Sequence, residues 1–454
     1  MNRWIWIALA ALLVVAAGVT LVAVPRGQEW TTSSPEALAE FEAGTDAQNK
    51  IYFAEAQEHY GRAFEFDPDF VMAKWRYAGA LFDDDQDRAE ELFEELMTAD
   101  TSNLTPRETF FIERWRANRD GRTDDAARLL DEYHTRYPND PYIVNVRANR
   151  AWNSGELEEA GRIYEDLLKI DPNWVTAYNA LGYISMMRGR FIESEEHFKS
   201  YRYIAPDQAN PHDSLGELFI TTGRYGEAEA SLETAIEIKP DFWASYTHLS
   251  IMNAYTGNAD GTRAIIERAK AAGMPERAVF EMSCLALYSE MADREEWRQI
   301  LDQRDSECVA GFRSGFAVVV THRAACRTGD WETVQGIEDE AAGNLLSAEN
   351  DGDGRDMAAI RAFLHHMQGV RLAIQGEYGA AAERFRAADD RLTFMQVDTG
   401  MYKLYNRMLL VETMLAGGKD AEAHKLLASV RSINPALVAE FETSGFRLLG
   451  LGRG

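Results

Sequence analysis

Small and large side chains recur along the chain in a pattern that repeats every 34 residues between Pro141 and Phe242. In each of three consecutive units, a small residue precedes a large one by four positions: Ala160 and Tyr164, Ser194 and Phe198, Ala228 and Leu232. Residues four apart lie on one face of a helix, so each pair predicts a helix whose small position lets a neighbour approach closely. A fixed period of 34 residues indicates a repeat built from two helices.

Glycines and prolines mark where the two helices of each unit end. They recur at 34-residue intervals: Gly155, Gly189 and Gly223, then Pro172, Pro206 and Pro240. Glycine adopts the left-handed backbone at the end of the first helix without steric cost. Proline has no N–H to donate and ends the second helix. The pattern therefore predicts helix–turn–helix units.

These residues resemble the tetratricopeptide repeat, with Gly182 and Gly216 in its small slot, Ala160 or Ala228 in its second helix, and a closing proline. The stretch Ala205 to Leu218 also resembles a segment of a bacterial subgroup of these proteins. The resemblance implies an all-α, right-handed α-solenoid that binds a partner, and it names no ligand.

The rest of the chain is organised around this array of repeats. The predicted segments are a signal anchor or transmembrane helix at 1–25, a linker at 26–36, a repeat array at 37–276 with strict register over 107–276, degenerate helical repeats at 277–346, an acidic glycine-rich loop at 347–356, and C-terminal repeats with a capping helix at 357–454. The usual turn glycine is replaced around Lys50 and Ile51, and Met291 stands in its place in the degenerate part.

The chain starts with an apolar segment, Trp4 to Val24, that contains no charged residue. A helix of that length is about as long as the ~30 Å hydrocarbon layer is thick. Pro25 disfavours cleavage after Val24, which predicts an uncleaved single-pass anchor in a bacterial inner membrane. The flanking charges place the large domain in the periplasm. The alternative is a cleaved signal that leaves a soluble periplasmic protein.

The chain is strongly acidic, with 74 acidic against 47 basic residues and a net charge of −27. This charge disfavours nucleic acid as a partner and favours basic partners. The alternative is a solvated acidic exterior without a specific role. Three cysteines lack the spacing of a zinc site. Either Cys284 or Cys326 could pair with Cys308 in an oxidising compartment, although free buried thiols are the commoner outcome.

No catalytic motif is present in the sequence, so we expect no enzymatic activity, no cofactor and no bound metal. Adjacent helical residues such as His365 and His366 point about 100° apart and do not share a metal easily. His212, Asp213 and Ser214 are consecutive and cannot converge on one substrate atom. The abundant Trp and Tyr residues at repeat spacing are interpreted as core residues rather than sugar-stacking surfaces.

A polar row is predicted on the first helices of the central units, facing the groove of the solenoid. Its members are Asn145, Asn149, Asn179, Tyr183, Asp213 and Glu217. Asparagine amides donate and accept hydrogen bonds, as an extended peptide backbone requires, and the two acids would favour a basic segment. The alternative is a merely solvated surface.

Three functions compete on this sequence. The first is a non-catalytic, membrane-anchored scaffold that binds a protein or peptide in the groove. The second is a periplasmic chaperone or secretion and envelope-assembly factor. The third is an enzyme or glycan-binding protein, which alone predicts a deep pocket with converging polar groups near Cys284 to Arg355. The sequence does not determine the partner, the pathway or the oligomeric state.

Overall fold

The computed structural model of the protein describes residues 29–82, 84–310, 315–351, 354–391, 399–444, 449 and 451. Within these ranges every regular element is a helix. The all-α repeat architecture expected from the sequence is therefore confirmed. The predicted anchor at 1–25 lies outside the described residues. Among the helices between residues 29 and 444, none combines the length and the apolar character needed to cross a bilayer.

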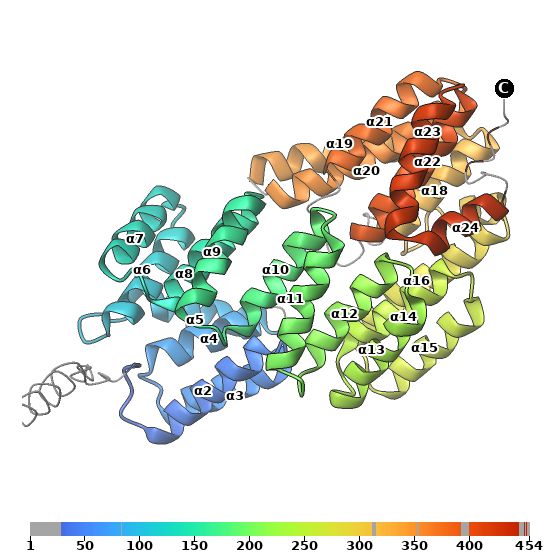
Figure 1. The fold of residues 1–454 in the computed structure, drawn as a ribbon. Coiled ribbons are helices and arrows are strands. Elements are labelled where there is room, and N and C mark those ends of the chain that lie inside the picture. The colour runs from blue at the N-terminus through green and yellow to red at the C-terminus, as the bar shows by residue number, and fades with distance from the viewer. Residues whose placement is uncertain are drawn as a thin grey trace, which may run out of the picture. The chain divides into compact units, whose positions relative to one another are not determined.

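The chain divides into two compact units, Met1–Tyr137 and Pro138–Gly454. This division falls inside the repeat array that the sequence predicted as continuous over 37–276. The helices of the first unit are α2 (Pro35–Asn49), α3 (Phe53–Phe66), α4 (Val71–Leu81), α5 (Gln86–Thr98), α6 (Pro106–Arg119) and α7 (Thr123–Arg136). They pack as successive antiparallel pairs (Figure 1).

The segment before α2 belongs to the first unit, whereas the sequence predicted a free linker up to residue 36. Trp30 is buried, and its ring lies 5.0 Å from that of Phe41, centroid to centroid. The backbone N–H of Thr31 donates to Glu108 at 2.7 Å, and the Thr31 hydroxyl donates to the same carboxylate. Glu108 also closes a capping box with Thr105 at the start of α6. One buried carboxylate thus holds both this segment and a helix end, because it accepts from several donors at once.

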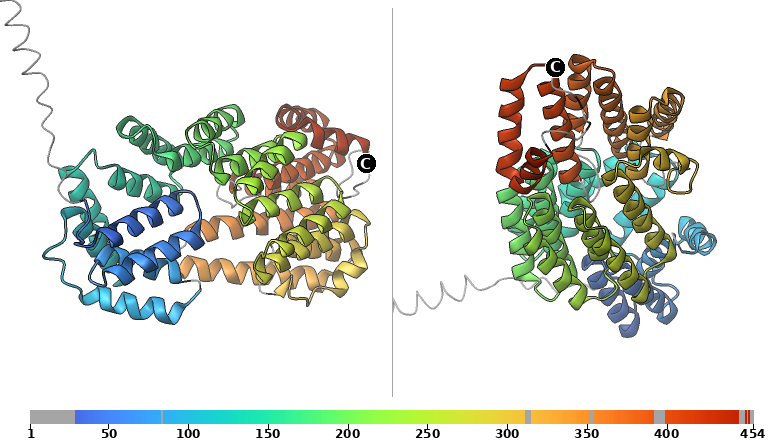
Figure 2. Two further views of the ribbon diagram at one scale, coloured as in Figure 1. Left: turned by 90° about the horizontal axis from the view of Figure 1, so that it is seen from below. Right: turned by 90° about the vertical axis from the view of Figure 1, so that its right-hand side faces the viewer.

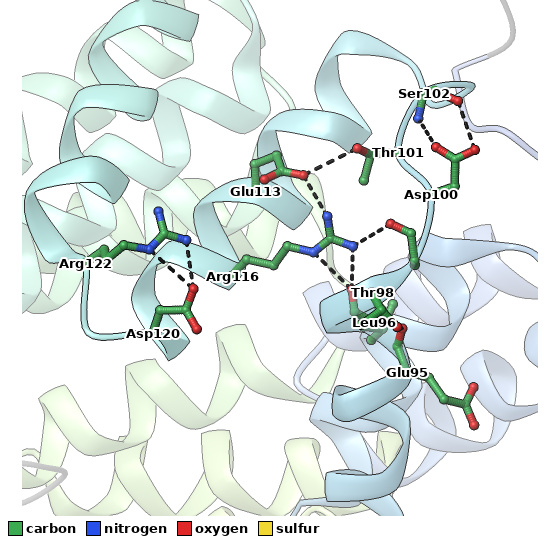
Figure 3. A network of polar contacts seen from close by, with 11 residues as sticks. Glu95, Leu96, Thr98, Asp100, Thr101, Ser102, Glu113, Arg116, Asp120 and Arg122 are labelled. Atoms are coloured by element: carbon green, nitrogen blue, oxygen red, sulfur yellow. Dashed lines mark hydrogen bonds and ion pairs between the residues drawn. The ribbon is translucent and has the colours of Figure 1, made fainter.

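Arg116 links α5 to α6 by capping the carboxyl end of α5 (Figure 3). Its guanidinium donates to the carbonyl of Leu96 through Nε at 3.0 Å and Nη2 at 2.6 Å, and to that of Ala99 at 2.6 Å. Nη1 donates to Glu113 at 2.8 Å. The last carbonyls of a helix have no partner within it, so the arginine satisfies acceptors that would otherwise require water.

The second unit contains the central repeats and the whole C-terminal half of the chain. Its helices are α8 (Pro141–Asn153), α9 (Leu157–Ile170), α10 (Val175–Met187), α11 (Phe191–Ile204), α12 (Ala209–Thr221), α13 (Tyr225–Ile238), α14 (Trp243–Tyr255), α15 (Ala259–Ala271), α16 (Glu276–Asp293), α17 (Trp297–Asp302), α18 (Gly315–Thr328), α19 (Trp331–Asp351), α20 (Gly354–Ile374), α21 (Tyr378–Arg391), α22 (Thr399–Ala416), α23 (Asp420–Ile433) and α24 (Pro435–Thr443).

The C-terminal helices return to the central repeats of the same unit. Helix α22 contacts both α10 and α12 (Figures 1 and 2). At the start of α24, the Asn434 side chain donates to the carbonyl of Thr221 at 3.1 Å, across 213 residues of sequence. One hydrophobic core accordingly extends from Met186 to Leu449. The unit therefore closes on itself instead of ending as an open stack.

Two segments differ from the expected loops and turns. The predicted loop at 347–356 is mostly helical, since α19 continues to Asp351 and α20 starts at Gly354. Alanine and glutamate in its first half support a helix. The turn expected at Met291 lies further on, where Glu295 has a φ of 54°. Met291 is buried within α16, which no glycine interrupts.

A disulfide joins Cys284 of α16 to Cys308, which follows α17. Cys326 is free and buried. The expectation that free thiols are the commoner outcome is therefore wrong for Cys284 and Cys308. Of the two possible partners of Cys308, the structure pairs it with Cys284. The bond closes a loop across 24 residues in the part of the unit where the repeat signature is weakest. Such a crosslink restricts the unfolded chain and stabilises a region with few local constraints.

Candidate functional site

The predicted polar row is assembled by the stacking of successive first helices. The Tyr183 hydroxyl of α10 donates to Glu217 of α12 at 2.8 Å, and the Ser214 hydroxyl donates to Asn179 at 3.0 Å. These pairs are separated by 34 and 35 residues in sequence. Burial, and then the nearby Glu217 carboxylate, raise the pKa of Tyr183 well above its usual range. The repeat spacing thus brings polar side chains of α10 and α12 into contact.

The C-terminal end of the row is buried. Asp213 accepts hydrogen bonds from Ser245 at 2.7 Å and from the imidazole of His248 at 2.9 Å, and all three residues are buried. Glu217 is also buried. Helix α12 is 13 residues long and His212 is its only residue that is not buried. The acids predicted to attract a basic ligand therefore act in the packing between repeats.

The N-terminal end of the row remains accessible. Asn149 is exposed, and its side chain accepts a hydrogen bond from the Tyr164 hydroxyl at 2.5 Å. Asn145, Asn179 and Tyr183 are half-buried. An accessible polar surface is thus formed by α8 and α10, and we call these residues, Asn145, Asn149 and Asn179 with Tyr183, the asparagine row.

Helix α22 contacts α12, the helix that carries the buried end of the row. Four of its consecutive residues, Met408 to Val411, are buried, so this part of α22 is enclosed by protein on all sides. A helix without a polar face indicates burial within a core, and this signal was present in the sequence. The period of the repeats did not reveal it, because α22 packs against helices nearly two hundred residues earlier in the chain.

A cavity of about 290 Å³ lies within the second unit. Its walls come from α13, α14, α16, α17, α18, α20, α22 and α24, so the returning C-terminal helices complete it. A pocket in this region was expected only from the third function, an enzyme or a glycan-binding protein. None of the residues predicted from the sequence to bind a partner lines this cavity. Trp297 and the neighbouring aromatics were interpreted as core.

Charged groups converge on this cavity. Asp293 and Glu440 both line it, and partial burial raises the pKa of each carboxyl, with Asp293 adding to the effect on Glu440. Arg323 lies on the same wall, where it donates to the hydroxyl of Tyr405 at 2.5 Å. Its guanidinium carbon is 5.2 Å from the centroid of the Trp297 ring. Pockets that combine apolar walls with a few converging polar groups are typical ligand sites.

A cysteine, a histidine and a glutamate also meet in the second unit, but without nucleophilic character. Cys326 Sγ is 3.8 Å from His322 Nδ1, and His322 Nε2 is 3.1 Å from Glu338. Arg371 donates to the same carboxylate at 2.9 Å. Burial raises the pKa of the Cys326 thiol to about 12, so the reactive thiolate is absent at neutral pH. Within the described ranges, no group of three or more His, Cys, Asp or Glu residues, this one included, is arranged to hold a metal ion.

Comparison with known protein families identifies tetratricopeptide repeats in the second unit. Two family models match, one over residues 145–209 and the other over residues 211–242. The first contains the asparagine row, and the second contains Asp213 and Glu217. No curated protein matches the chain.

Several solved structures are similar to the chain at low sequence identity. A tetratricopeptide repeat protein from Parabacteroides merdae is 14% identical, with 56% of this chain and 100% of that chain covered and a TM-score of 0.38. A monomeric mutant of IFIT1 with Gppp-AAAA is 14% identical over 92% of this chain and 96% of that one, also at 0.38. The APC/C hetero-tetramer Cut9–Hcn1 is 12% identical over 90% and 76%, again at 0.38. Likeness at these scores carries no argument about function.

Proposed function

We propose that the protein is a non-catalytic scaffold that binds a protein or peptide partner through the asparagine row. Tetratricopeptide repeats typically serve protein–protein interaction. The observation that carries the proposal is that solvent reaches the polar residues at equivalent repeat positions of α8 and α10. Amides spaced by the repeat suit an extended backbone, because each can donate and accept.

The proposed partner is a single extended segment. Because Asp213 and Glu217 are buried, a preference for basic partners rests on the net charge of −27 and not on these two carboxylates. A chaperone or envelope-assembly factor would use the same surface for loosely specified clients. It would bind many unrelated extended peptides with similar affinity, whereas a dedicated scaffold would prefer one.

We place the protein in a bacterial inner membrane, anchored by residues 4–24, with both units in the periplasm. The Cys284–Cys308 disulfide supports an oxidising compartment. Only five residues separate Val24 from the docked Trp30, which limits the span between them to about 20 Å. Release by carbonate extraction, with a shortened N-terminus, would refute the anchor. Protection from protease in spheroplasts would reverse the topology.

The partner surface is tested by site-specific photocrosslinking. A photoreactive residue at position 149 should capture a defined partner, whereas the same residue at Arg162 should not. Arg162 lies on α9 of the same repeat with 72% of its side chain exposed, which makes it a matched control. Equal capture from both positions would remove the asparagine row as the site.

A double variant, Asn145→Ala with Asn179→Ala, then tests the amides themselves. Capture should fall while the helical melting curve stays unchanged. Asp213 is left intact, because its removal would take away the acceptor of the hydrogen bonds from buried Ser245 and His248. A loss of capture could then reflect a loss of stability and not a loss of binding. Full retention of capture by the double variant would overturn the proposal.

A further inference from the structure

The cavity in the second unit is unusually rich in aromatic side chains. Eight of them line it: Tyr225, Tyr255, Trp297, Phe316, Phe363, Tyr402, Tyr405 and Phe441. A volume of about 290 Å³ suits a small molecule and not a peptide segment. Aromatic faces carry negative electrostatic potential, so walls of this kind favour cations as well as hydrocarbon groups.

A hydrogen-bond chain determines which nitrogen of His366 carries its proton. Asn406 Nδ2 donates to the carbonyl of Phe385 at 2.9 Å, and that carbonyl can only accept. The amide of Asn406 is thereby oriented, and its Oδ1 lies 2.9 Å from His366 Nδ1. Because Oδ1 also accepts only, Nδ1 must bear the hydrogen.

The other nitrogen of His366 is therefore a bare acceptor. The residue is 93% buried, and its ring lines the cavity. In the part of the chain that the structure describes, the hydrogen bond of the ring is made by Nδ1 and none is made by Nε2. Burial lowers the pKa of His366 to about 4, so the ring stays neutral at pH 7. A neutral imidazole that presents a lone pair requires a donor from a ligand or from water.

Two exposed carboxylates also line the cavity. Within the described ranges, neither Asp293 nor Glu440 has a side-chain hydrogen bond or an ion pair, although solvent reaches both. Their mutual repulsion contributes to the raised pKa of Glu440. A positive charge placed between them would relieve this repulsion and recover part of the cost of partial desolvation.

The overall charge of the cavity is negative. Its lining contains three carboxylates, Asp293, Glu295 and Glu440, against the single guanidinium of Arg323, which leaves a net charge of −2. Arg323 donates to Tyr405 and lies over the ring of Trp297, and its positive charge partly opposes the rise in the pKa of Asp293. Among the uncharged lining groups, His366 Nε2 is an acceptor, the tyrosine and serine hydroxyls both donate and accept, and Trp297 Nε1 is a donor without a partner among the described residues.

We propose that this cavity binds a small organic ammonium ion, a protonated amine with N–H donors and a hydrocarbon body. The carboxylates of Asp293 and Glu440 compensate its charge, His366 Nε2 accepts one of its N–H groups, and the aromatic walls enclose its apolar part. This site is separate from the asparagine row and lies beyond the proposed scaffold function.

The first test compares ligands of similar shape on the full-length protein by titration calorimetry. The ion 2-phenylethylammonium should bind. The neutral alcohol 2-phenylethanol, the anion 3-phenylpropionate and the neutral sugar N-acetylglucosamine should not. The trimethylated ammonium of the same skeleton lacks N–H donors and should bind at least about tenfold more weakly. Absence of binding by the amine, equal affinity for the alcohol or for the trimethylated ion, or preference for the sugar would each overturn the proposal.

The second test separates the cavity from the general attraction of an acidic protein for cations. Asp293→Asn with Glu440→Gln should lower the affinity for 2-phenylethylammonium at least about tenfold. The melting temperature should stay the same or rise, because these isosteric changes remove unpaired carboxylates. The matched control is Asp305→Asn, whose side chain is 93% exposed, and its affinity should equal that of the parent. An equal loss in the control, or full affinity in the double variant, would refute the site.

Discussion

At the scale of single residues, Gly223 illustrates how one backbone position serves both a turn and a distant contact. Its φ is +73°, which favours glycine. A Cβ added there would lie 2.2 Å from Oδ1 of Asn434, which belongs to the returning C-terminal segment. The repeat pattern predicted a turn glycine at this position, and the structure confirms it. The need for a residue without a side chain next to Asn434 was not predictable. Asn434 lies 211 residues further along the chain, and the 34-residue period does not indicate contacts at that separation.

We expect Gly223→Ala to destabilise the protein by about 2 kcal/mol more than Gly189→Ala. Both variants introduce the strain of a left-handed backbone, which costs about 1 kcal/mol. Gly189 has a φ of +72° and only Phe191 at 4.0 Å from an added Cβ, so it isolates the collision with Asn434. Urea unfolding of the two variants measures the difference. Equal losses would mean that the segment around Asn434 moves away without cost.

Stability should also depend on the protonation of His366. Its pKa is about 4 in the folded protein against an ordinary value of 6.5, so the unfolded chain binds more protons between these limits. Stability is therefore full above pH 6.5 and is lost as the pH falls from 6.5 towards 4. Between pH 7 and pH 5 the loss from this residue is about 2 kcal/mol.

The variant His366→Asn retains a donor for Asn406 but cannot titrate. Urea unfolding at pH 7 and pH 5 should show a smaller loss in this variant than in the parent, by about the same 2 kcal/mol. Other buried histidines, such as His322, contribute equally to both proteins and cancel in the comparison. Parallel pH dependence in the two proteins would contradict the assignment.

At the scale of helices, close packing within each repeat accounts for the small residues that recur in the sequence. A Cβ added to Gly182 in α10 would lie 2.3 Å from the ring of Phe198 in α11, and Phe198 is fully buried. The pairing of small and large positions was predictable, because it follows the 34-residue period. Because Phe198 is fully buried, its ring cannot turn out into solvent.

We expect Gly182→Ala to destabilise the protein by about 2 kcal/mol or more, because overpacking forces the ring or the helix to shift. Gly161→Ala in α9 is the matched control. Its nearest atom would be Ile184 Cγ2 at 3.9 Å, so alanine should stabilise that helix by up to about 1 kcal/mol. Opposite shifts of the melting temperature are expected. Shifts of the same sign would contradict the packing assigned to these helices.

Helix ends were predictable where glycine marks them and less so elsewhere. Ile51, in the turn that lacks glycine, has a φ of 65°, as expected from the replaced turn. In α16 the left-handed position moved to Glu295, because nothing in the sequence ends the helix earlier. The composition of residues 347–356 also predicted a longer loop between α19 and α20 than the structure has. Charged residues such as glutamate are compatible with both a loop and a solvated helix.

At the scale of the whole molecule, the 34-residue period indicates the contacts between neighbouring repeats. It does not indicate contacts between repeats that are distant in sequence. The division between Tyr137 and Pro138 left no mark in the sequence, since Gly121 and Pro138 continue the 34-residue register. The contacts that α22 and α24 make with the central repeats were likewise not predictable from a local sequence pattern. For the same reason the burial of Asp213 and Glu217 was not predictable from the repeat pattern. The cavity, which exists only because the chain returns, could not be located.

Removal of α24 tests this closure directly. A chain ending at Ile433 loses the hydrogen bond from Asn434 to Thr221 and the side chains of Leu437 and Phe441 that line the cavity. If the unit is closed, hydrogen exchange should accelerate in α12 and α13, about two hundred residues away, as well as in α22 and α23. The full-length variant Asn434→Ala should show a smaller change in the same direction, confined to the turn around Gly223. In an open stack, each repeat depends only on its neighbours, and exchange would then accelerate in α22 and α23 alone.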